Sequence, residues 1–379
     1  MAVKVRKGTH SKPYQVRYRD AQGRRRSKQF RLKKEADAYN IKIGGELQEG
    51  IHIPDRATIS VVEAGRLWIT TAQAANLERT TIVQYQQHLN LHIAPFIGWM
   101  SLSKITVPAL RAFEDRLRDE GRSIALIRKI LVSMSSLLSD AQERGLVARN
   151  VARDRRRGRQ ERRGTRLKMG IDIPLPSEIK TIVAAATGRW RPIVLTVVFT
   201  GLRSSELRGL RWQDVDLEMR MLHVRQRADR WGQIGPPKSE AGERSIPLPP
   251  MVVNTLREWK LACPKGDLDL VFPNGRGKPE SHANIINRGL KPLLIAAGIC
   301  DTIEGRIVPR YGGLHCFRHF YASWLLNRKE DGGLGLPYKS VQSRMGHSTL
   351  AMTADTYGHL FEEQNDHDAL AAGEIALLR

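Results

Sequence analysis

A stretch in the middle of the chain is too basic to belong to a folded core. Residues 149–168, RNVARDRRRGRQERRGTRLK, carry 10 Lys and Arg against 2 acidic residues and almost no apolar side chains. A segment without apolar surface to bury cannot pack against a domain, so we interpret residues 151–170 as a linker. The chain is therefore expected to fold as separate domains on the two sides of this linker.

Positive charge extends well beyond the linker. The 379 residues include 62 Lys and Arg against 39 Asp and Glu, a formal net charge of +23. This excess is larger than solubility requires and predicts a large polyanionic partner, of which nucleic acid is the default. On this view the linker is a polycationic strap that crosses a DNA duplex; the alternative is a merely soluble spacer.

Cysteine usage and hydropathy exclude several classes of protein. Cys263, Cys300 and Cys316 lie in separate segments, so neither a disulfide framework nor a zinc-binding CxxC pair is indicated. The longest strongly apolar run, residues 193–199, is far shorter than a membrane span, and the N-terminus has no apolar core. We expect a cytoplasmic protein without membrane association.

Residues 1–56 are predicted to form a small basic domain, with 15 Lys and Arg against 6 acidic residues. Alternation between Tyr14 and Phe30 indicates two short strands around a turn, and the pattern from Lys33 to Gln48 indicates a helix. Aromatic side chains between basic ones suit contact with phosphates and sugars, so this β-β-α unit is interpreted as a DNA-binding arm domain. A solvated basic hairpin is the plainer alternative.

The remaining segments predict a multidomain, mainly α-helical fold. Residues 57–150 carry apolar side chains at helical spacing and should form an all-helical domain with a core of its own. Residues 171–360 have a mixed, mostly helical pattern with a small β-sheet. In that region PPKSEAGERSIPLPP predicts a hairpin, with Gly242 in the turn and Lys238 at or beside the tip. Residues 361–379 form a tail with a helix-favouring end.

Two segments near the C-terminus gather groups suited to attack on a phosphodiester. LHCFRHFYASWLL contains His315 and Arg318, which share a helix face at i and i+3, and MGHSTLAMTADTYGHL contains His347 and Tyr357. A tyrosine phenol, with a pKa of about 10, is a poor nucleophile at neutral pH and needs neighbouring cations or bases. The histidines and arginines are groups of that kind.

A third motif adds further charges. In TGLRSSELRGLRWQDVD, Arg203 and Glu206 lie three residues apart on one face of a predicted helix, whereas Arg208 and Arg211 are interpreted as cations on the helix surface. An arginine fork matches two non-bridging oxygens of a phosphate, which a lysine cannot imitate. His315, Cys316 and the following His319 do not indicate a metal site, because adjacent side chains on a helix diverge and no further ligand completes a set.

In this order the residues resemble the tyrosine recombinases of the phage-integrase type. That family carries an arginine in a GLRxSEL-like motif, a lysine in a β-hairpin turn, an HxxR motif, a histidine or tryptophan after LG, and a nucleophilic tyrosine. The resemblance is strong over residues 172–360. It is weaker over residues 58–150, which look like the family's helical core-site-binding domain, and the arm resembles the arm-site-binding domain of integrases.

The resemblance implies a role for each residue of the constellation. Tyr357 would be the nucleophile that forms a 3′-phosphotyrosine, Arg203 and Arg318 would hold the scissile phosphate, and Lys238 would protonate the leaving 5′ oxygen. His315 would be the general base or proton carrier. Supporting contacts would come from His347, as a hydrogen-bond donor to the phosphate, and from Glu206, which would orient the side chains around it.

The implied function is site-specific DNA recombination and integration by the integrase of a prophage or other mobile element, without a cofactor or metal. The partners would be double-stranded attachment-site DNA and three further copies in a tetramer that forms a Holliday junction, with accessory DNA-bending or directionality proteins. The tail at 361–379 would dock on a neighbouring protomer or pack on its own. Alternatives are a type IB-like topoisomerase and a non-catalytic DNA-binding regulator of the same fold.

Overall fold

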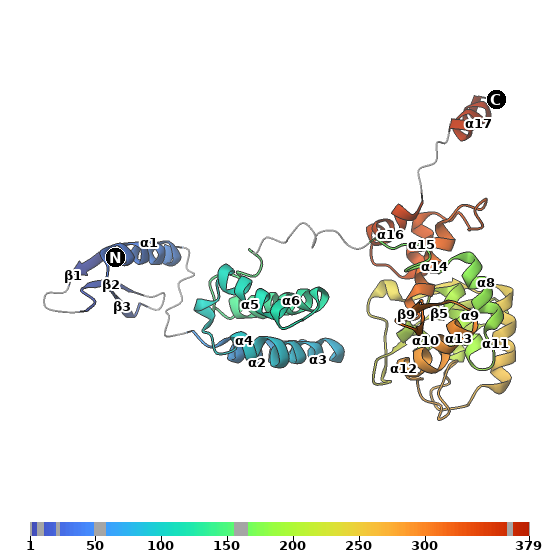
Figure 1. The fold of residues 1–379 in the computed structure, drawn as a ribbon, viewed down its shortest axis with the longest axis horizontal. Coiled ribbons are helices and arrows are strands. Elements are labelled where there is room, and N and C mark those ends of the chain that lie inside the picture. Colours follow the sequence, from blue (N-terminus) through green and yellow to red (C-terminus); the bar gives the residue numbers. More distant parts are fainter. Residues whose placement is uncertain are drawn as a thin grey trace. The chain divides into compact units, whose positions relative to one another are not determined.

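The computed structural model of this chain describes residues 2–5, 11–19, 23–48, 58–154, 166–361 and 367–378. The chain divides into two compact units, residues 1–163 and 164–379, which are described separately (Figure 1). As predicted, the protein is mainly helical with small sheets. Most of the predicted linker, residues 155–165, lies outside the described residues. No described helix is long and apolar enough to cross a membrane.

The N-terminal part of the first unit is a small sheet covered by one helix. The sheet has the order β1-β2-β3, formed by Ala2–Val5, Tyr14–Arg19 and Arg25–Phe30, and α1 spans Lys33–Gln48. The two predicted strands and the helix are present, whereas β1 was not predicted. It is a four-residue strand that pairs antiparallel with β2, and its alternation, Val3-Lys4-Val5, is too short to distinguish a strand from an irregular segment. Val16, Ala36 and Ile43 form the buried centre.

Residues 58–154, the other described part of the first unit, form a helical domain, as the apolar spacing predicted. Its long helix α6 buries Ile127, Ile130, Leu131 and Met134 on one face. Side-chain caps at Ser60, Thr106 and Ser123 fix the starts of three helices, and Ser60 forms a reciprocal capping box with Glu63. The helices are α2 (Val61–Ala74), α3 (Arg79–His88), α4 (Ala94–Ile97), α5 (Val107–Asp119) and α6 (Ile124–Glu143).

The second unit packs helices around one continuous core, with small sheets at its side. Figure 1 shows α14, α15 and α16 together at one end of this unit. The helices are α8 (Pro176–Ala185), α9 (Trp190–Thr200), α10 (Ser204–Gly209), α11 (Pro250–Ala262), α12 (His282–Asn284), α13 (Lys291–Ala296), α14 (His315–Leu326), α15 (Tyr338–Met345), α16 (Leu350–Tyr357) and α17 (His367–Leu378). The strands are β4 (Val215–Asp216), β5 (Met221–Val224), β6 (Arg227–Ala228), β7 (Ile234–Gly235), β8 (Arg244–Pro247), β9 (Cys300–Ile303) and β10 (Arg306–Pro309).

The hairpin predicted around Gly242 is wrong in its pairing. The hairpin of this region is β6–β7, whose tip is residues 229–233, while β8 pairs antiparallel with β5. Pro236 and Pro237 follow β7 and lack the N–H groups that a longer ladder would need. Lys238 therefore lies in a loop beyond the hairpin, and Gly242 lies in a short 3₁₀ helix, Glu240–Gly242.

Arg208 also differs from its prediction as a surface cation, because its side chain is buried. Its guanidinium donates to the carbonyl oxygens of Glu280 and of Asp229, the latter at 3.0 Å. The bond to Asp229 fixes α10 to the β6–β7 hairpin, and the bond to Glu280 fixes it to the segment before α12. Arg211 is partly exposed and pairs with Asp214 at 2.9 Å.

Candidate active site

Two helices of the second unit end in left-handed glycines whose carbonyl groups face arginines. Gly201, with φ 60°, ends α9, and its oxygen accepts a hydrogen bond from Nη1 of Arg318 at 2.7 Å. Gly346, with φ 62°, ends α15, and its oxygen accepts from Nη2 of Arg203 at 3.0 Å. A Cβ at Gly346 would lie 2.7 Å from the carbonyl oxygen of Ala241, so only glycine fits there.

Arg318 is the most deeply held of these cations. It lies on the inner face of α14, and only 3% of its surface is exposed. Nη2 donates to the carbonyl oxygen of Met345, so both amino groups of the guanidinium are fixed by backbone carbonyls. The orientation of the Arg318 guanidinium group is therefore fixed before any ligand binds.

Glu206 joins two arginines through its carboxylate. Oε1 accepts from Nη1 of Arg203 at 2.7 Å, and Oε2 accepts from Nη2 of Arg244 at 2.8 Å. Burial alone would raise the pKa of Glu206, but Arg244 and Arg203 outweigh it and lower the pKa to about 2. The carboxylate is therefore charged at neutral pH. The resemblance implies an orienting role for Glu206, whereas no sequence motif points to Arg244. Arg244 also donates to the carbonyl oxygen of Arg344.

This cluster holds more positive than negative charge. Within the described part of the chain, these contacts bring together the guanidinium groups of Arg203, Arg244 and Arg318 and one carboxylate, that of Glu206. Burial and the neighbouring Arg203 lower the pKa of Arg318 to about 9, which leaves it charged at neutral pH but electrostatically crowded. A bound anion such as a phosphate would relieve that repulsion.

Tyr357, at the end of α16, is buried beside this cluster and is 1% exposed. Its phenol oxygen lies 2.9 Å from Nδ1 of His319. Burial raises the pKa of Tyr357 to about 12, although Arg318 acts in the opposite direction. The phenol is therefore protonated at neutral pH, and a proton acceptor must assist any attack by it.

Of the other two histidines of the site, His347 contacts Tyr357 and His315 contacts His319. The ring of His347 is stacked parallel to that of Tyr357, with centroids 6.4 Å apart, and its Nδ1 lies 2.9 Å from Oγ1 of Thr353. Burial and the nearby arginines lower the pKa of His347 to about 4. His315 contacts the ring of His319, at 4.4 Å between centroids, and burial, Arg318 and Arg203 lower its pKa.

His319 is the site residue that sequence reasoning set aside. The HxxR motif of the family ends at Arg318, one residue before His319. A signal was present, because His319 lies four residues after His315 and therefore one helical turn along the same face of α14. What could not be read from the sequence is that α16 brings Tyr357 to this face.

Lys238 is exposed, on the loop that joins β7 to the 3₁₀ helix Glu240–Gly242. That 3₁₀ helix packs against Gly346, the residue before His347, through the carbonyl of Ala241. A Cβ at Gly242 would lie 2.6 Å from Cβ of Pro237, so the loop is also closely packed on itself. The structure thus attaches the Lys238 loop to the turn that carries His347.

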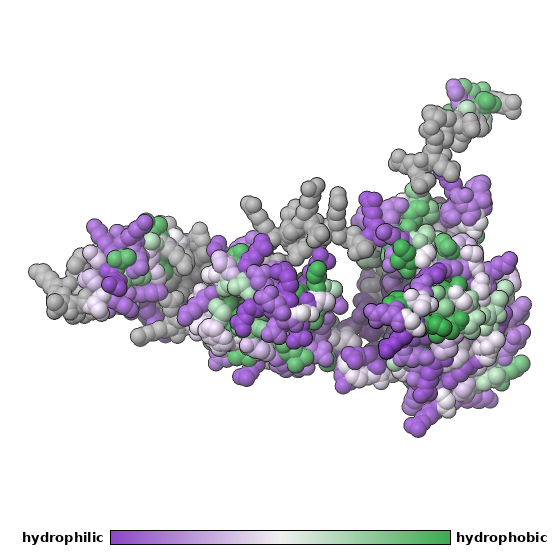
Figure 2. All heavy atoms as spheres, in the orientation of Figure 1, coloured by the Kyte–Doolittle hydropathy of each residue, from purple (hydrophilic) through white to green (hydrophobic). Residues whose placement is uncertain are grey.

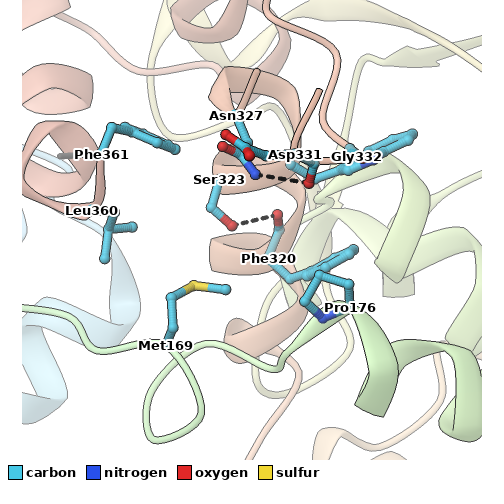
Figure 3. A pocket seen from close by; sticks show the side chains of 10 residues that line it. Met169, Pro176, Phe320, Ser323, Asn327, Asp331, Gly332, Leu360 and Phe361 are labelled. Atoms are coloured by element: carbon cyan, nitrogen blue, oxygen red, sulfur yellow. Dashed lines mark hydrogen bonds between the residues drawn. The ribbon is translucent and has the colours of Figure 1, made fainter. Parts of the chain in front are cut away.

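A pocket of about 120 Å³ lies at the other end of α14, beside the chain that follows Tyr357 (Figure 3). Phe320 of α14 lies on one side, while Leu360 and Phe361 approach from the other, and Trp324 also lines the pocket. A more open cavity of about 620 Å³ shares Leu360 and Phe361 with it. Among the described residues no group of three or more His, Cys, Asp or Glu side chains could hold a metal ion.

Comparison with known proteins assigns the family. Residues 175–364 match the phage integrase family, and residues 65–118 match its N-terminal SAM-like domain. The chain belongs to the phage integrase family. It is a tyrosine recombinase, as the sequence motifs predicted.

Relatives support this assignment along most of the chain. The tyrosine recombinase XerC-like protein of Caldanaerobacter subterraneus subsp. tengcongensis is 25% identical over 375 residues, which cover 91% of each protein. The ICEBs1 integrase of Bacillus subtilis is 24% identical over 87% of this chain and 86% of its own.

Solved structures share the fold. One is the Tn1549 transposon integrase bound to transposon right-end DNA, with a TM-score of 0.66 and 18% identity, covering 84% of this chain and all of the other. A lambda integrase tetramer bound to a Holliday junction has a TM-score of 0.56 and 17% identity, covering 92% and 95%.

Proposed function

We propose that this recombinase integrates a mobile element, such as a prophage, by cutting and rejoining attachment-site DNA through a 3′-phosphotyrosine at Tyr357. The observation that carries the proposal is the placement of the buried Tyr357 phenol beside an arginine cluster with excess positive charge. Such a cluster suits the anionic, five-coordinate phosphorus of the transition state. Because the covalent link conserves the bond energy, rejoining needs no ATP.

Arg318 and Arg203 hold the non-bridging oxygens of the scissile phosphate, and Glu206 orients Arg203 for that task. His347 donates a hydrogen bond to the phosphate, since its Nδ1 is occupied by Thr353 and leaves Nε2 for a ligand. Lys238 protonates the leaving 5′ oxygen from its exposed loop, and His315 carries protons at the edge of the site. The attachment of the Lys238 loop to Gly346 supports this assignment.

Tyr357→Phe tests the nucleophile directly. The variant keeps the ring that packs beside His347 but loses the attacking oxygen, so DNA binding should persist while the covalent adduct disappears. Adduct is measured by denaturing gel after reaction with attachment-site DNA, and sequencing the trapped DNA identifies the cut site. An adduct that survives this substitution would place the nucleophile elsewhere.

We also propose that residues 1–56 bind a second class of DNA site, as an arm domain. Exposed basic side chains such as Arg17 and Arg25 alternate along its strands, and Lys28 lies over the ring of Tyr39 at 4.6 Å. Deleting residues 1–56 should spare cleavage at the core site but impair assembly on long attachment sites. Unchanged integration of long sites would remove this role.

The tail is proposed to dock on a second copy of the chain within a tetramer on DNA. Helix α17 exposes Leu370, Ile375, Leu377 and Leu378, which is more apolar surface than a solvated helix of this length keeps uncovered. The pocket in Figure 3 offers an apolar surface of suitable kind. Changing Leu377 and Leu378 to Asp should reduce strand exchange without reducing binding of a single protomer, and unaltered exchange would contradict the proposal.

A further inference from the structure

The hydrogen bond between His319 and Tyr357 has a defined direction. The two atoms, Nδ1 and the phenol oxygen, are 2.9 Å apart, and the ring centroids are separated by 5.8 Å. The phenol has a pKa of about 12, and burial together with His315 and Arg318 lowers the pKa of His319 to about 4. The phenol therefore keeps its proton and donates, Nδ1 accepts, and the imidazole carries its hydrogen on Nε2.

Other charged and titratable groups face His319 from each neighbouring element. His315 and Arg318 lie on its own helix, and His347 lies on the turn after α15. Asp172, in the segment before α8, acts in the opposite direction and favours a protonated His319. An anionic phosphate on the arginine cluster would offset the charge of Arg318 and would also favour protonation.

We propose that His319 is the general base of strand cleavage, taking at Nδ1 the proton that Tyr357 releases as its oxygen bonds to phosphorus. The proposal rests on Tyr357 being the nucleophile. The O–H bond of the phenol breaks, the bond from its oxygen to phosphorus forms, and the bond from phosphorus to the 5′ oxygen breaks. His319 becomes imidazolium, while Lys238 gives a proton to the 5′ oxygen; rejoining reverses both transfers.

Neither of the other two histidines is placed to accept this proton. His347 is stacked face to face with the tyrosine ring, and its Nδ1 is already bonded to Thr353. The ring contact recorded for His315 is with His319, edge to face, one turn further toward the start of α14. The role of general base, which the family resemblance implies for His315, is therefore assigned to His319, one helical turn later.

The test measures the rate of adduct formation on a nicked duplex that carries the core sequence found in trapped wild-type adducts. His319→Asn places an amide oxygen near the position of Nδ1, so it can accept the hydrogen bond but cannot take the proton. General base catalysis contributes about 10²–10⁴-fold, and the variant should be slower by that factor at pH 7. The deficit should shrink as pH rises, because phenolate then forms without a base.

His223→Asn is the matched control, since Nδ1 of His223 makes a similar contact, 2.8 Å from Oγ of Ser245 on the neighbouring strand. Its rate should remain within about twofold of the wild-type rate at every pH. Imidazole added to His319→Ala should restore part of the rate, which a purely structural role would not permit.

A substrate with sulfur in place of the 5′ bridging oxygen separates the two proton transfers, because thiolate leaves without a general acid. Lys238→Ala should recover on this substrate, whereas His319→Asn should remain slow. If the rate of His319→Asn also recovered on this substrate, His319 would assist the departure of the 5′ oxygen, and the proposal would be overturned.

The possible failures are distinguishable. If Tyr357→Phe still forms an adduct, the proposed nucleophile is wrong and this inference falls with it. If Tyr357→Phe is inactive but His319→Asn reacts at the wild-type rate, or is slowed equally at all pH values, only the role of His319 is overturned. If the variants fold poorly, the pH dependence of the wild-type rate of adduct formation decides. A tenfold rise of that rate per pH unit between pH 6 and 9 would mean that hydroxide, and no side chain, removes the proton of the phenol.

Discussion

The site has a half built from permanent charges and a half built from groups that the fold keeps neutral. The phosphate half, which we propose binds the scissile phosphate, consists of Arg203, Glu206, Arg244 and Arg318. Their charged groups are fixed by carbonyl oxygens and by one another. The nucleophile half, which contains the proposed nucleophile and its neighbours, consists of His319, His347 and Tyr357, where burial favours the uncharged forms. The two halves meet where Arg318 and His319 follow each other on α14.

This difference suggests how the work of the reaction is divided. Charges that are already aimed need no reorganisation when negative charge develops on the phosphate. Groups that remain neutral can exchange protons during the reaction and return to the same state after rejoining. The comparison therefore predicts that, between pH 6 and 8, only variants of the nucleophile half show a loss of rate that depends on pH.

The largest effect should come from Arg318→Lys in the phosphate half. Lysine presents one ammonium in place of the fork that bonds Gly201 and Met345, so it loses a bidentate contact with the phosphate and leaves a carbonyl without its donor. Adduct formation should fall by about 10²–10³-fold. Unlike the deficit of His319→Asn, this loss of rate should be the same from pH 6 to 8, where Arg318, with its pKa of about 9, keeps its charge. A deficit that becomes smaller as pH rises within this range would contradict the division of the site into two halves.

A second prediction separates the halves by acid stability. The pKa of Glu206 falls from 4.5 to about 2 on folding, so its contribution is complete above pH 4.5 and is lost as pH falls toward 2. Glu206→Gln should lower the free energy of unfolding of the catalytic unit by about 3 kcal/mol at pH 7. Urea titrations at pH 7, 4 and 2.5 should show the difference from wild type shrinking in that order.

The histidines of the nucleophile half affect stability in a higher pH range than Glu206 does. Their pKa values fall to about 4 from 6.5, so the unfolded chain gains protons first and stability declines as pH drops from 6.5 to 4. Glu206→Gln should retain this upper decline, which serves as the internal control. Loss of both declines in one variant would mean that the two halves titrate as a single network.

The smallest predicted effect concerns Gly346→Ala. Besides its left-handed φ, the new Cβ would meet the carbonyl of Ala241, so the variant should lose about 1–3 kcal/mol of stability and shift His347. Gly298→Ala is the control, because Gly298 has a φ of 71° but no atom within 4 Å of the added Cβ. Equal loss of stability in the two variants would show that the contact with Ala241 does not matter.

The sequence motifs indicated every member of each half except one, Arg244 in the phosphate half and His319 in the nucleophile half. The roles assigned to these members stay predictions. The arginines in short motifs could be recognised because a guanidinium is charged in almost any environment. The helical domains could be recognised by the spacing of their apolar residues. Arg244 and the Lys238 loop depend on which strand pairs with β8, and that pairing is not local. His319 gains its partner only when α16 packs near α14, a contact between residues 38 positions apart.

The glycine-ended helices α9 and α15 also bear on the electrostatics of the protein before it meets DNA. The carbonyls of Gly201, Met345 and Gly346 are the negative ends of two helix macrodipoles, and each accepts a bond from a site arginine. These helix ends partly neutralise the arginines, and because they belong to the backbone they remain in place when a ligand binds. A phosphate entering the site would therefore share its arginines with the helix ends and need not displace an acidic side chain.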